Sequence, residues 1–255
     1  MAENNKNNNH YKISDNDAGF EISDEFERFN QINDIFSRAF WDNSVRNDLS
    51  DAFFESHRVQ PNAKKASGFQ QKDFALRNAA WAVSDTFSDR SAHAGNREGF
   101  QSWMENDASI ASEKLAIDDI GKFSNELKQI AKLFGADLIG FVPIDERWHY
   151  SKKVNTIKFE PVSNKLPGNF SSVIVMGHAM DKSLVDTYPS ALASSAAGLE
   201  YSREAAIVTQ MTTYIRSLGY EALGSMNDTA LAIPYAIQAG LGEYGRNQMV
   251  ITPEF

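Results

Sequence analysis

The strongest constraint on the fold lies between Ile117 and Val142, where an amphipathic helix leads directly into a buried strand. Apolar residues recur there at helical spacing and predict one helix face, made of Ile120, Phe123, Leu127, Ile130 and Phe134. Gly135 follows as a C-cap, because glycine readily adopts the left-handed conformation that ends many helices. Residues 137–142 then form an apolar run of strand length. A helix that feeds a strand in this way is typical of α/β proteins.

Further strands and helices are expected in the rest of the chain. Short apolar runs predict three more strands, over residues 172–176, 220–223 and 249–252. Apolar residues at helical spacing predict helices over residues 207–218 and 229–239. Because helices alternate with buried strands, the fold class is expected to be α/β, as an α+β sandwich.

The sequence before residue 117 has a weaker pattern. Phenylalanines from Phe26 to Phe40 recur at helical spacing behind Ser23, a suitable N-cap, and predict an amphipathic helix with an aromatic face. A second helix is expected around residues 74–87. Two polar stretches without periodicity are expected to be loops, residues 43–72 and 88–106.

These patterns divide the chain into three regions. Residues 1–21 are rich in Asn and other polar residues, and they are expected to be a disordered leader because they cannot bury enough apolar surface. Residues 22–116 are expected to form an N-terminal region of helices and loops. Residues 117–255 are expected to form the α/β core.

The charge of the chain disfavours several classes of partner. Its 34 acidic and 25 basic residues give a net charge of -9, which repels polyphosphate backbones. The basic residues form no patch, so no nucleic-acid partner is expected. No stretch reaches the roughly 18 apolar residues that a transmembrane helix needs. The N-terminus has neither twin arginines nor an apolar signal core, so the chain as given is expected to be cytoplasmic.

The sequence contains no cysteine. This excludes disulfides, thiolate nucleophiles, zinc–thiolate sites and iron–sulfur clusters held by this chain. Histidines offer no alternative, because none lies three or four residues from another and no His-Glu-x-x-His run occurs. No metal ligand is therefore expected among the five histidines, His10, His57, His93, His149 and His178.

The run from Gly240 to Gly245 matches G-x-G-x-x-G, the dinucleotide-binding fingerprint. That fingerprint needs a strand before the glycines and a helix after them, so that backbone amides point at a pyrophosphate. Here a helix is expected before the run and a strand after it. A nicotinamide site is therefore disfavoured. A loop that lets the backbone approach something flat or bulky remains, as does a simple turn between helix and strand.

The glycine run and its neighbours resemble the corrinoid-binding segment of reductive dehalogenases and, more distantly, of epoxyqueuosine reductases. The residues that carry this resemblance are Gln238, Ala239, Gly240, Leu241, Gly242, Glu243, Gly245, Arg246 and Asn247. Other segments agree in order and spacing, namely residues 135–140, 145–151, 194–202 and 218–229. The resemblance covers about the last 120 residues.

The resemblance implies a nitroreductase-like core that binds a corrinoid of the cobalamin type and removes halide from a small organohalide. It implies that Tyr201 is the proton donor, with Asn227 beside it, and that Ser194 and Ser195 contact the cofactor. Trp148 would help to line the substrate pocket. Structural alternatives stay open: Tyr201 and Trp148 could be packing residues, Asn227 a helix cap, and Glu243 with Arg246 a surface ion pair.

The chain departs from the family pattern in one important respect. Family members continue beyond the position of Phe255 with a module that holds two 4Fe-4S clusters, and this chain has no cysteine to ligate them. Electrons would have to come from a missing or separate iron–sulfur module, and this chain alone is expected to be an inactive fragment. Family members are also often exported by means of a twin-arginine signal, and they associate with the membrane. No such signal is seen in this sequence.

Two alternatives to a dehalogenase remain. A non-catalytic corrinoid-binding protein or a relic would explain the absence of cysteine. An epoxyqueuosine reductase is less favoured, because that family is expected to have aspartate where Tyr201 stands and because the acidic chain does not suit tRNA.

Overall fold

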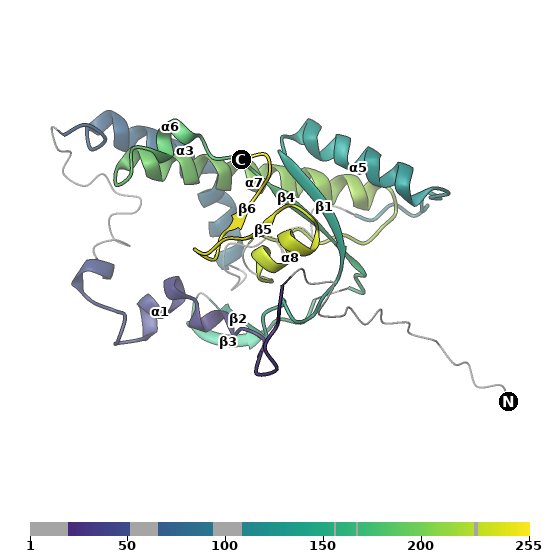
Figure 1. Ribbon diagram of the computed structural model, residues 1–255, viewed down its shortest axis with the longest axis horizontal. Helices are drawn as coiled ribbons and strands as arrows, with labels where there is room; N and C mark the ends of the chain where they lie inside the picture. The colour runs from purple at the N-terminus through teal and green to yellow at the C-terminus, as the bar shows by residue number, and fades with distance from the viewer. Residues whose placement is uncertain (1–19, 52–65, 94–108, 156, 167, 227–228) are drawn as a thin grey trace.

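The computed structural model describes residues 20–51, 66–93, 109–155, 157–166, 168–226 and 229–255 (Figure 1). Helices and strands are both present, as expected for the α/β class. The helices with defined bounds are the 3-10 helix η2 (Gln31–Asn33), α1 (Ile35–Trp41), α3 (Gln71–His93), α5 (Ile120–Phe134), α6 (Lys182–Val185), α7 (Ala191–Ser217) and α8 (Ala232–Gln238). Residues 48–51 are also helical, so the loop predicted at 43–72 is wrong there. The strands are β1 (Leu138–Pro143), β2 (Lys152–Asn155), β3 (Glu160–Ser163), β4 (Ser172–Gly177), β5 (Glu243–Tyr244) and β6 (Val250–Ile251).

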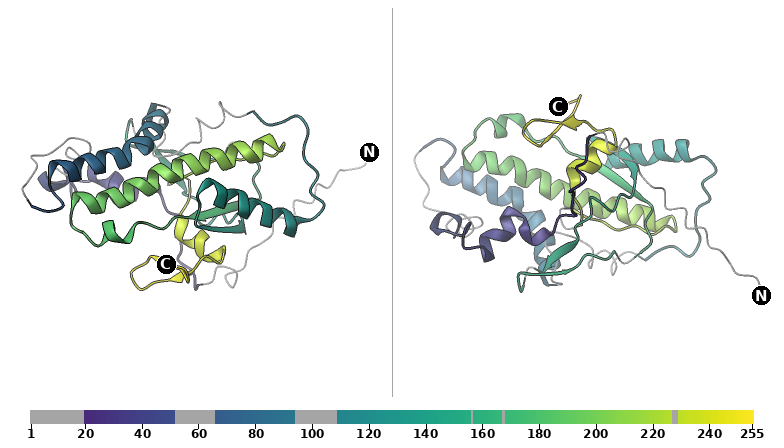
Figure 2. Two further views of the ribbon diagram at one scale, coloured as in Figure 1. Left: turned by 90° about the horizontal axis from the view of Figure 1, so that it is seen from above. Right: turned by 60° about the horizontal axis from the view of Figure 1, so that its bottom comes forward.

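The centre of the fold is a ribbon made of β1 and β4, which pair antiparallel with Ile139 opposite Met176. The α5 and α7 helices cover one face of this β1–β4 ribbon, and α8 covers the other (Figures 1 and 2). Side chains alternate between the two faces of a strand. In β4, Ile174 and Met176 therefore face α5 and α7, while Val173 and Val175 face α8.

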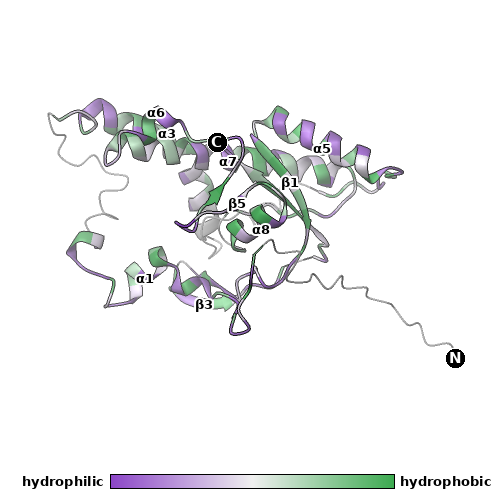
Figure 3. Ribbon diagram, in the orientation of Figure 1, coloured by the Kyte–Doolittle hydropathy of each residue, from purple (hydrophilic) through white to green (hydrophobic). Residues whose placement is uncertain are grey.

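The β1 strand has the colour of hydrophobic residues in Figure 3, and apolar residues of the β1–β4 ribbon pack on both of its faces. The α5 helix is amphipathic and alternates in colour along its length, because one stripe meets the ribbon and α7 while the other meets solvent. Its C-cap is Gly135 with φ of 113°, in the left-handed region. The predicted helix, glycine cap and strand at residues 120–143 are thus confirmed.

The long helix α7 begins at Ala191, sixteen residues before the predicted start at 207. Its first half consists largely of Ala, Ser and Gly, which give little apolar periodicity. The start is set instead by Ser190, whose side chain accepts a hydrogen bond from Ala193 N at 3.1 Å. The small residues let α3 lie closely along α7 (Figure 2).

The predicted helix from Phe26 to Phe40 is wrong. Only η2 and α1 are helical there, because Asn30 and Asp34 cap separate helix starts by accepting from Ile32 N at 3.3 Å and Phe36 N at 2.8 Å. Residues 26–29 before them are outside any helix, and Phe29 O accepts from Ser151 N at 2.8 Å.

The strand expected at 220–223 is also wrong. These residues form no ladder in the described structure, and the carbonyl of Ala222 accepts from the Arg216 side chain at 3.2 Å instead.

Other predictions need new boundaries. The α3 helix continues to His93, so the predicted loop at 88–106 is wrong up to that residue, and residues 94–108 lie outside the described chain. The α8 helix starts at Ala232 because Leu231 N donates to Trp148 O at 2.9 Å. The β6 strand lies within the predicted 249–252 and pairs antiparallel with β5. Of the expected leader, residues 1–21, the first nineteen lie outside the described residues, and Phe20 packs on Trp148.

Replacement of Ile207 by Ala tests the packing of α7 on the ribbon. Ile207 is fully buried, so Ile207→Ala should lower the free energy of unfolding by about 2–5 kcal/mol. Ile120→Ala is the matched control, because Ile120 is 78% exposed, and it should change the value by at most about 0.5 kcal/mol. Urea denaturation followed by circular dichroism measures both. Equal losses for the two variants would contradict this packing.

Candidate functional site

A buried hydrogen-bond network joins the loop after β1 to the end of α8. Asp145 is only 5% exposed and forms a two-point ion pair with Arg147, at 3.0 Å from Nε to Oδ1 and 2.7 Å from Nη2 to Oδ2. Gln238 Nε2 donates to Asp145 Oδ2 at 3.0 Å, and Gln238 Oε1 accepts from the Trp148 indole at 2.9 Å. We call these four residues the Asp145 network. It fixes the orientation of the Trp148 ring, which is 2% exposed.

The hydroxyl of Tyr235 strengthens the same junction. It accepts from Asp145 N and donates to Asp145 O, both at 3.0 Å. Its single proton is thereby used, so His149 Nε2, 2.8 Å away, carries the proton of the hydrogen bond between them. The backbone N–H, carbonyl and carboxylate of Asp145 thus all have hydrogen-bond partners on α8.

Burial shifts the pKa of each titratable group in this junction. For Asp145, burial alone would raise the pKa, but the hydrogen bonds from Arg147 and Gln238 outweigh it and hold the pKa of the carboxyl below its usual value. Burial lowers the pKa of His149, and the positive charge of Arg28 lowers it further. Burial also raises the pKa of the Tyr235 phenol above its usual range. At neutral pH the junction thus holds an ionised Asp145, a neutral His149 and a neutral Tyr235.

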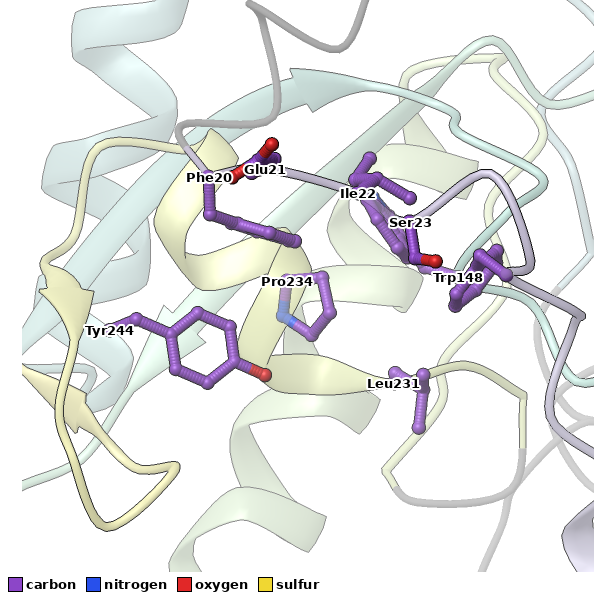
Figure 4. Close-up of a pocket in the computed structure, with 9 residues that line it drawn as sticks. Phe20, Glu21, Ile22, Ser23, Trp148, Leu231, Pro234 and Tyr244 are labelled. Atoms are coloured by element: carbon purple, nitrogen blue, oxygen red, sulfur yellow. The ribbon is translucent and has the colours of Figure 1, made fainter.

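An aromatic cavity of about 410 Å³ lies over Trp148 (Figure 4). Phe20 and Phe26 contact the Trp148 ring at centroid distances of 5.5 and 5.6 Å, and Phe20 meets the Tyr244 ring edge-on at 5.2 Å. The remaining lining is mostly apolar and consists of Glu21, Ile22, Ser23, Leu231 and Pro234. The cavity size is at the lower end of the range for small-molecule pockets. Trp148 therefore lines this cavity and also belongs to the hydrogen-bonded core.

The glycines of the 240–245 run have different surroundings. A side chain at Gly242 would collide with Ile251 O, and one at Gly245 would approach Asn247 and Met249, so these two glycines allow β5 and β6 to close on each other. Gly240 differs: its φ is 72°, and a Cβ there would meet nothing within 4 Å. The predicted order of helix, glycine run and strand is confirmed, since α8 precedes the run and β6 follows it.

The other residues predicted around this loop divide into packed and exposed groups. Ala239 and Leu241 pack on Gly140 of β1, where a Cβ would lie 2.6 Å from Ala239 O. Three polar residues are exposed along the β5–β6 hairpin, namely Glu243, Arg246 and Asn247. Asn247 Oδ1 also accepts from Met249 N at 3.2 Å and so supports the turn of the hairpin.

Tyr201 lies on α7, half-buried, beside the apolar residues Val208, Met226 and Met176. Its ring stacks on Trp81 of α3, with centroids 5.2 Å apart and an angle of 26°. The carbonyl of Ser194 accepts from the same indole at 3.1 Å. The Ser195 hydroxyl is fully buried and donates to Ala191 O within α7 at 3.1 Å. Asn227 lies outside the described residues.

The structure thus collects the predicted residues into two groups. Trp148, Gln238 and the glycine loop lie on the α8 face of the β1–β4 ribbon. Tyr201, Ser194 and Ser195 lie on α7, on the opposite face. Among the described residues, the lining of the aromatic cavity does not include Tyr201.

Sequence reasoning missed three residues that organise these groups: Phe20, Trp81 and Tyr235. Phe20 was assigned to the polar leader, although it is a large apolar residue next to the predicted helical region, which was a usable signal. Trp81 and Tyr235 both lie on predicted helices at apolar positions. Nothing in the local sequence distinguishes them from ordinary core residues.

The described part of the chain offers neither a group of metal ligands nor a membrane-spanning helix. Its His, Asp and Glu residues form no group of three that could hold a metal ion. Of its helices, none combines the length and apolarity required to cross a membrane.

Comparison with known proteins gives a consistent result. No family model matches the chain. Tetrachloroethene reductive dehalogenases from Desulfitobacterium hafniense and Dehalobacter restrictus are each 35% identical to it over 166 residues, an alignment that takes in 52% of this chain and 30% of theirs. The enzyme of that name from Sulfurospirillum multivorans is 28% identical over 159 residues. The chain therefore spans about a third of the length of these curated relatives.

Solved structures show the same fold. The catabolic reductive dehalogenase NpRdhA superposes with a TM-score of 0.63 and 16% identity, over 89% of this chain and 29% of that one. A second reductive dehalogenase structure, described in terms of B12-dependent dehalogenation, superposes with a TM-score of 0.57.

Acidification tests the neutral state of buried His149. An unfolded histidine has a pKa of about 6.5, and the folded value is lower, so below that pH the unfolded chain binds more protons than the folded one. The unfolding free energy should therefore fall between pH 7.5 and 5.5. His149→Gln can still donate to Tyr235 but does not titrate, so its loss over this range should be smaller. Urea titrations at both pH values measure the difference, and identical pH dependence of the two proteins would refute it.

Proposed function

The chain is a homologue of the reductive dehalogenases, an oxidoreductase family, and we propose that it forms the corrinoid-holding part of such an enzyme, with Tyr201 as proton donor. The observation that carries the proposal is the 35% identity to tetrachloroethene reductive dehalogenases. Similarity of fold to two reductive dehalogenase structures supports it. The proposed substrate is a small organohalide.

The proposed reaction replaces a carbon–halogen bond by a carbon–hydrogen bond. It consumes two electrons and one proton for each halide ion released. When bound, a reduced corrinoid supplies the electrons to the substrate. The residues of this chain hold the cofactor, exclude water and deliver the proton. Because the sequence has no cysteine to ligate a cluster, the proposal takes the electrons from an iron–sulfur module that is not part of this sequence.

Some of the predicted cofactor residues fit a large flat ligand, and others are already engaged within the protein. The open space at Gly240 and the exposed Glu243, Arg246 and Asn247 leave one edge of the hairpin free for contact. Gln238, in contrast, has its amide bound by Asp145 and Trp148.

The serines of α7 are engaged in a similar way. The Ser195 hydroxyl is bound within α7, and Ser194 Oγ accepts from the Trp81 indole at 3.4 Å. Within the chain we therefore assign corrinoid contact to Gly240 and to the exposed residues Glu243, Arg246 and Asn247, which we call the Gly240 edge. Gln238 and Ser195 are proposed to support it indirectly, by fixing α8 and α7.

Tyr201 is suited to proton delivery by its surroundings. Its ring is half-buried between Trp81 and the apolar side chains of Val208 and Met226, which exclude water from much of the phenol. A phenol titrates near about pH 10, so it donates a proton at neutral pH only if a nearby cation lowers its pKa. In the described chain the nearest candidate by sequence, Arg203, is engaged by Glu200 at 3.0 Å and Asp137 at 3.6 Å. The proposal therefore requires a cation other than Arg203 beside the phenol.

The absence of cysteine favours one alternative, a corrinoid-binding protein without its own electron supply. Such a protein would share the Gly240 edge but would not need Tyr201. Measurements of binding and of turnover separate the two functions.

Replacement of Gly240 by Asn tests the cofactor half of the proposal. Asn tolerates left-handed backbone, so Gly240→Asn should fold normally while its side chain fills the open space and weakens cobalamin binding by tenfold or more. Titration of the chain with cobalamin, followed by visible absorption, measures the affinity and should show base-off cobalamin for the unmodified chain. Gly135→Asn is the control, because it makes the same change at another positive-φ glycine, remote from the hairpin. An unchanged cobalamin spectrum with the unmodified chain would remove the corrinoid from the proposal.

Replacement of Tyr201 by Phe tests the proton donor. The chain with cobalamin alone should be inactive, whereas titanium(III) citrate as chemical reductant should allow it to dechlorinate tetrachloroethene faster than free cobalamin does. General acid catalysis contributes about 100-fold or more, so Tyr201→Phe should remove most of this excess rate while cobalamin affinity stays the same. Gas chromatography of the products measures the rate. No excess rate in the unmodified chain would favour the non-catalytic alternative, and an undiminished rate in Tyr201→Phe would exclude Tyr201 as donor.

A further inference from the structure

Trp81 covers the ring of Tyr201 on α7. The two rings are 5.2 Å apart between centroids and 26° from parallel, which is within the range of favourable offset stacking. Trp81 belongs to α3, which packs along α7 over much of its length. The residue that faces the proposed proton donor therefore comes from a region that resembles the dehalogenases only weakly in sequence.

The indole of Trp81 is fixed at both of its ends. Its N–H donates to the Ser194 carbonyl at 3.1 Å and approaches the Ser194 hydroxyl at 3.4 Å. Ser194 precedes Tyr201 by seven residues, about two helical turns on the same face of α7. The indole thus spans this face from Ser194 to Tyr201, with one end hydrogen-bonded and the other stacked.

Gly198 makes this arrangement possible. It lies in the interior of α7, where glycine is less favourable than alanine. A Cβ at Gly198 would be only 2.5 Å from Cδ1 of Trp81 and 2.7 Å from its Nε1. The missing side chain is therefore the space that the indole occupies.

Ser202 holds α3 in register with α7 at the same level. Its hydroxyl donates to Ala80 O at 2.5 Å and accepts from Ser84 N at 3.2 Å. These two bonds flank Trp81 along α3. Sliding of α3, which would displace the indole from Tyr201, would break both of them.

We propose that Trp81 is the positioning residue of Tyr201: it stacks on the phenol ring and keeps the hydroxyl pointing in one direction. The inference rests on the proposed function, in which Tyr201 delivers the proton. Ser194 and Gly198 then serve Tyr201 through Trp81, Ser194 by orienting the indole and Gly198 by admitting it. Trp81 itself exchanges no proton with the substrate.

Tyrosine ring NMR tests the positioning without any enzymatic assay. The signal that disappears in Tyr201→Phe identifies Tyr201 in protein with isotope-labelled tyrosine. In the unmodified chain the two edges of the Tyr201 ring should give separate signals, because stacking slows ring flips. In Trp81→Ala they should merge. Merged signals in the unmodified chain, or separate ones in a folded Trp81→Ala, would overturn the proposal.

The dechlorination assay with titanium(III) citrate and cobalamin supplies a second test. Trp81→Ala should lower kcat tenfold or more with little change in KM or cobalamin affinity, and Trp81→Phe, which can still stack, should recover part of the rate. Trp41→Ala is the matched control, because Trp41 is exposed on α1 and should leave the rate unchanged. Trp81→Phe also keeps the test decisive if Trp81→Ala fails to fold.

A double variant separates positioning from general packing. If Trp81 acts only through Tyr201, then Tyr201→Phe with and without Trp81→Ala should have equal rates. A further drop in the double variant would overturn the proposal. A slow Tyr201→Phe with an unaffected Trp81→Ala would refute this inference alone. An unaffected Tyr201→Phe would instead refute the donor role in the proposed function, and the positioning role with it.

Discussion

Everything else in the structure depends on the antiparallel pairing of β1 with β4. Two strands alone are only marginally stable in water, so the ribbon needs cover on both faces. The α5 and α7 helices supply one cover and α8 the other. The consequence for function is that the ribbon separates the chain into two compartments, one with Tyr201 and one with Trp148 and the glycine loop.

Buried polar interactions help to hold the α8 compartment. A charged carboxylate that is 5% exposed would be costly if it were unpaired, but Asp145 has Arg147 and Gln238 as partners. Removal of either partner leaves a buried group unsatisfied, whereas loss of an exposed ion pair such as that of Lys182 with Asp186 costs little. The network therefore fixes the end of α8, and with it the point from which the glycine loop departs.

Sequence reasoning succeeded where apolar periodicity was strong and local. The helix, Gly135 cap and strand at residues 120–143 were predicted closely, as were β4 and the end of α7. It failed at the N-terminus, where the aromatic spacing from Phe26 to Phe40 was overridden by the capping side chains of Asn30 and Asp34. It also failed at residues 220–223, which form no ladder and where the Ala222 carbonyl accepts a hydrogen bond from the side chain of Arg216, six residues away.

The candidate site shows the same division. The resemblance located Tyr201 and the glycine loop, because motifs are contiguous in sequence. It could not locate Trp81 or Tyr235, whose roles arise from contacts across more than 80 residues of chain.

Gly140 of β1 shows how little room a residue can have beside the glycine loop. The carbonyl oxygen and methyl group of Ala239 occupy the space that a Cβ at Gly140 would need. A methyl group added there would therefore push Ala239 away from β1. Variation at this one strand position could thus adjust the height of the 240–245 loop above the sheet without any change in the loop itself.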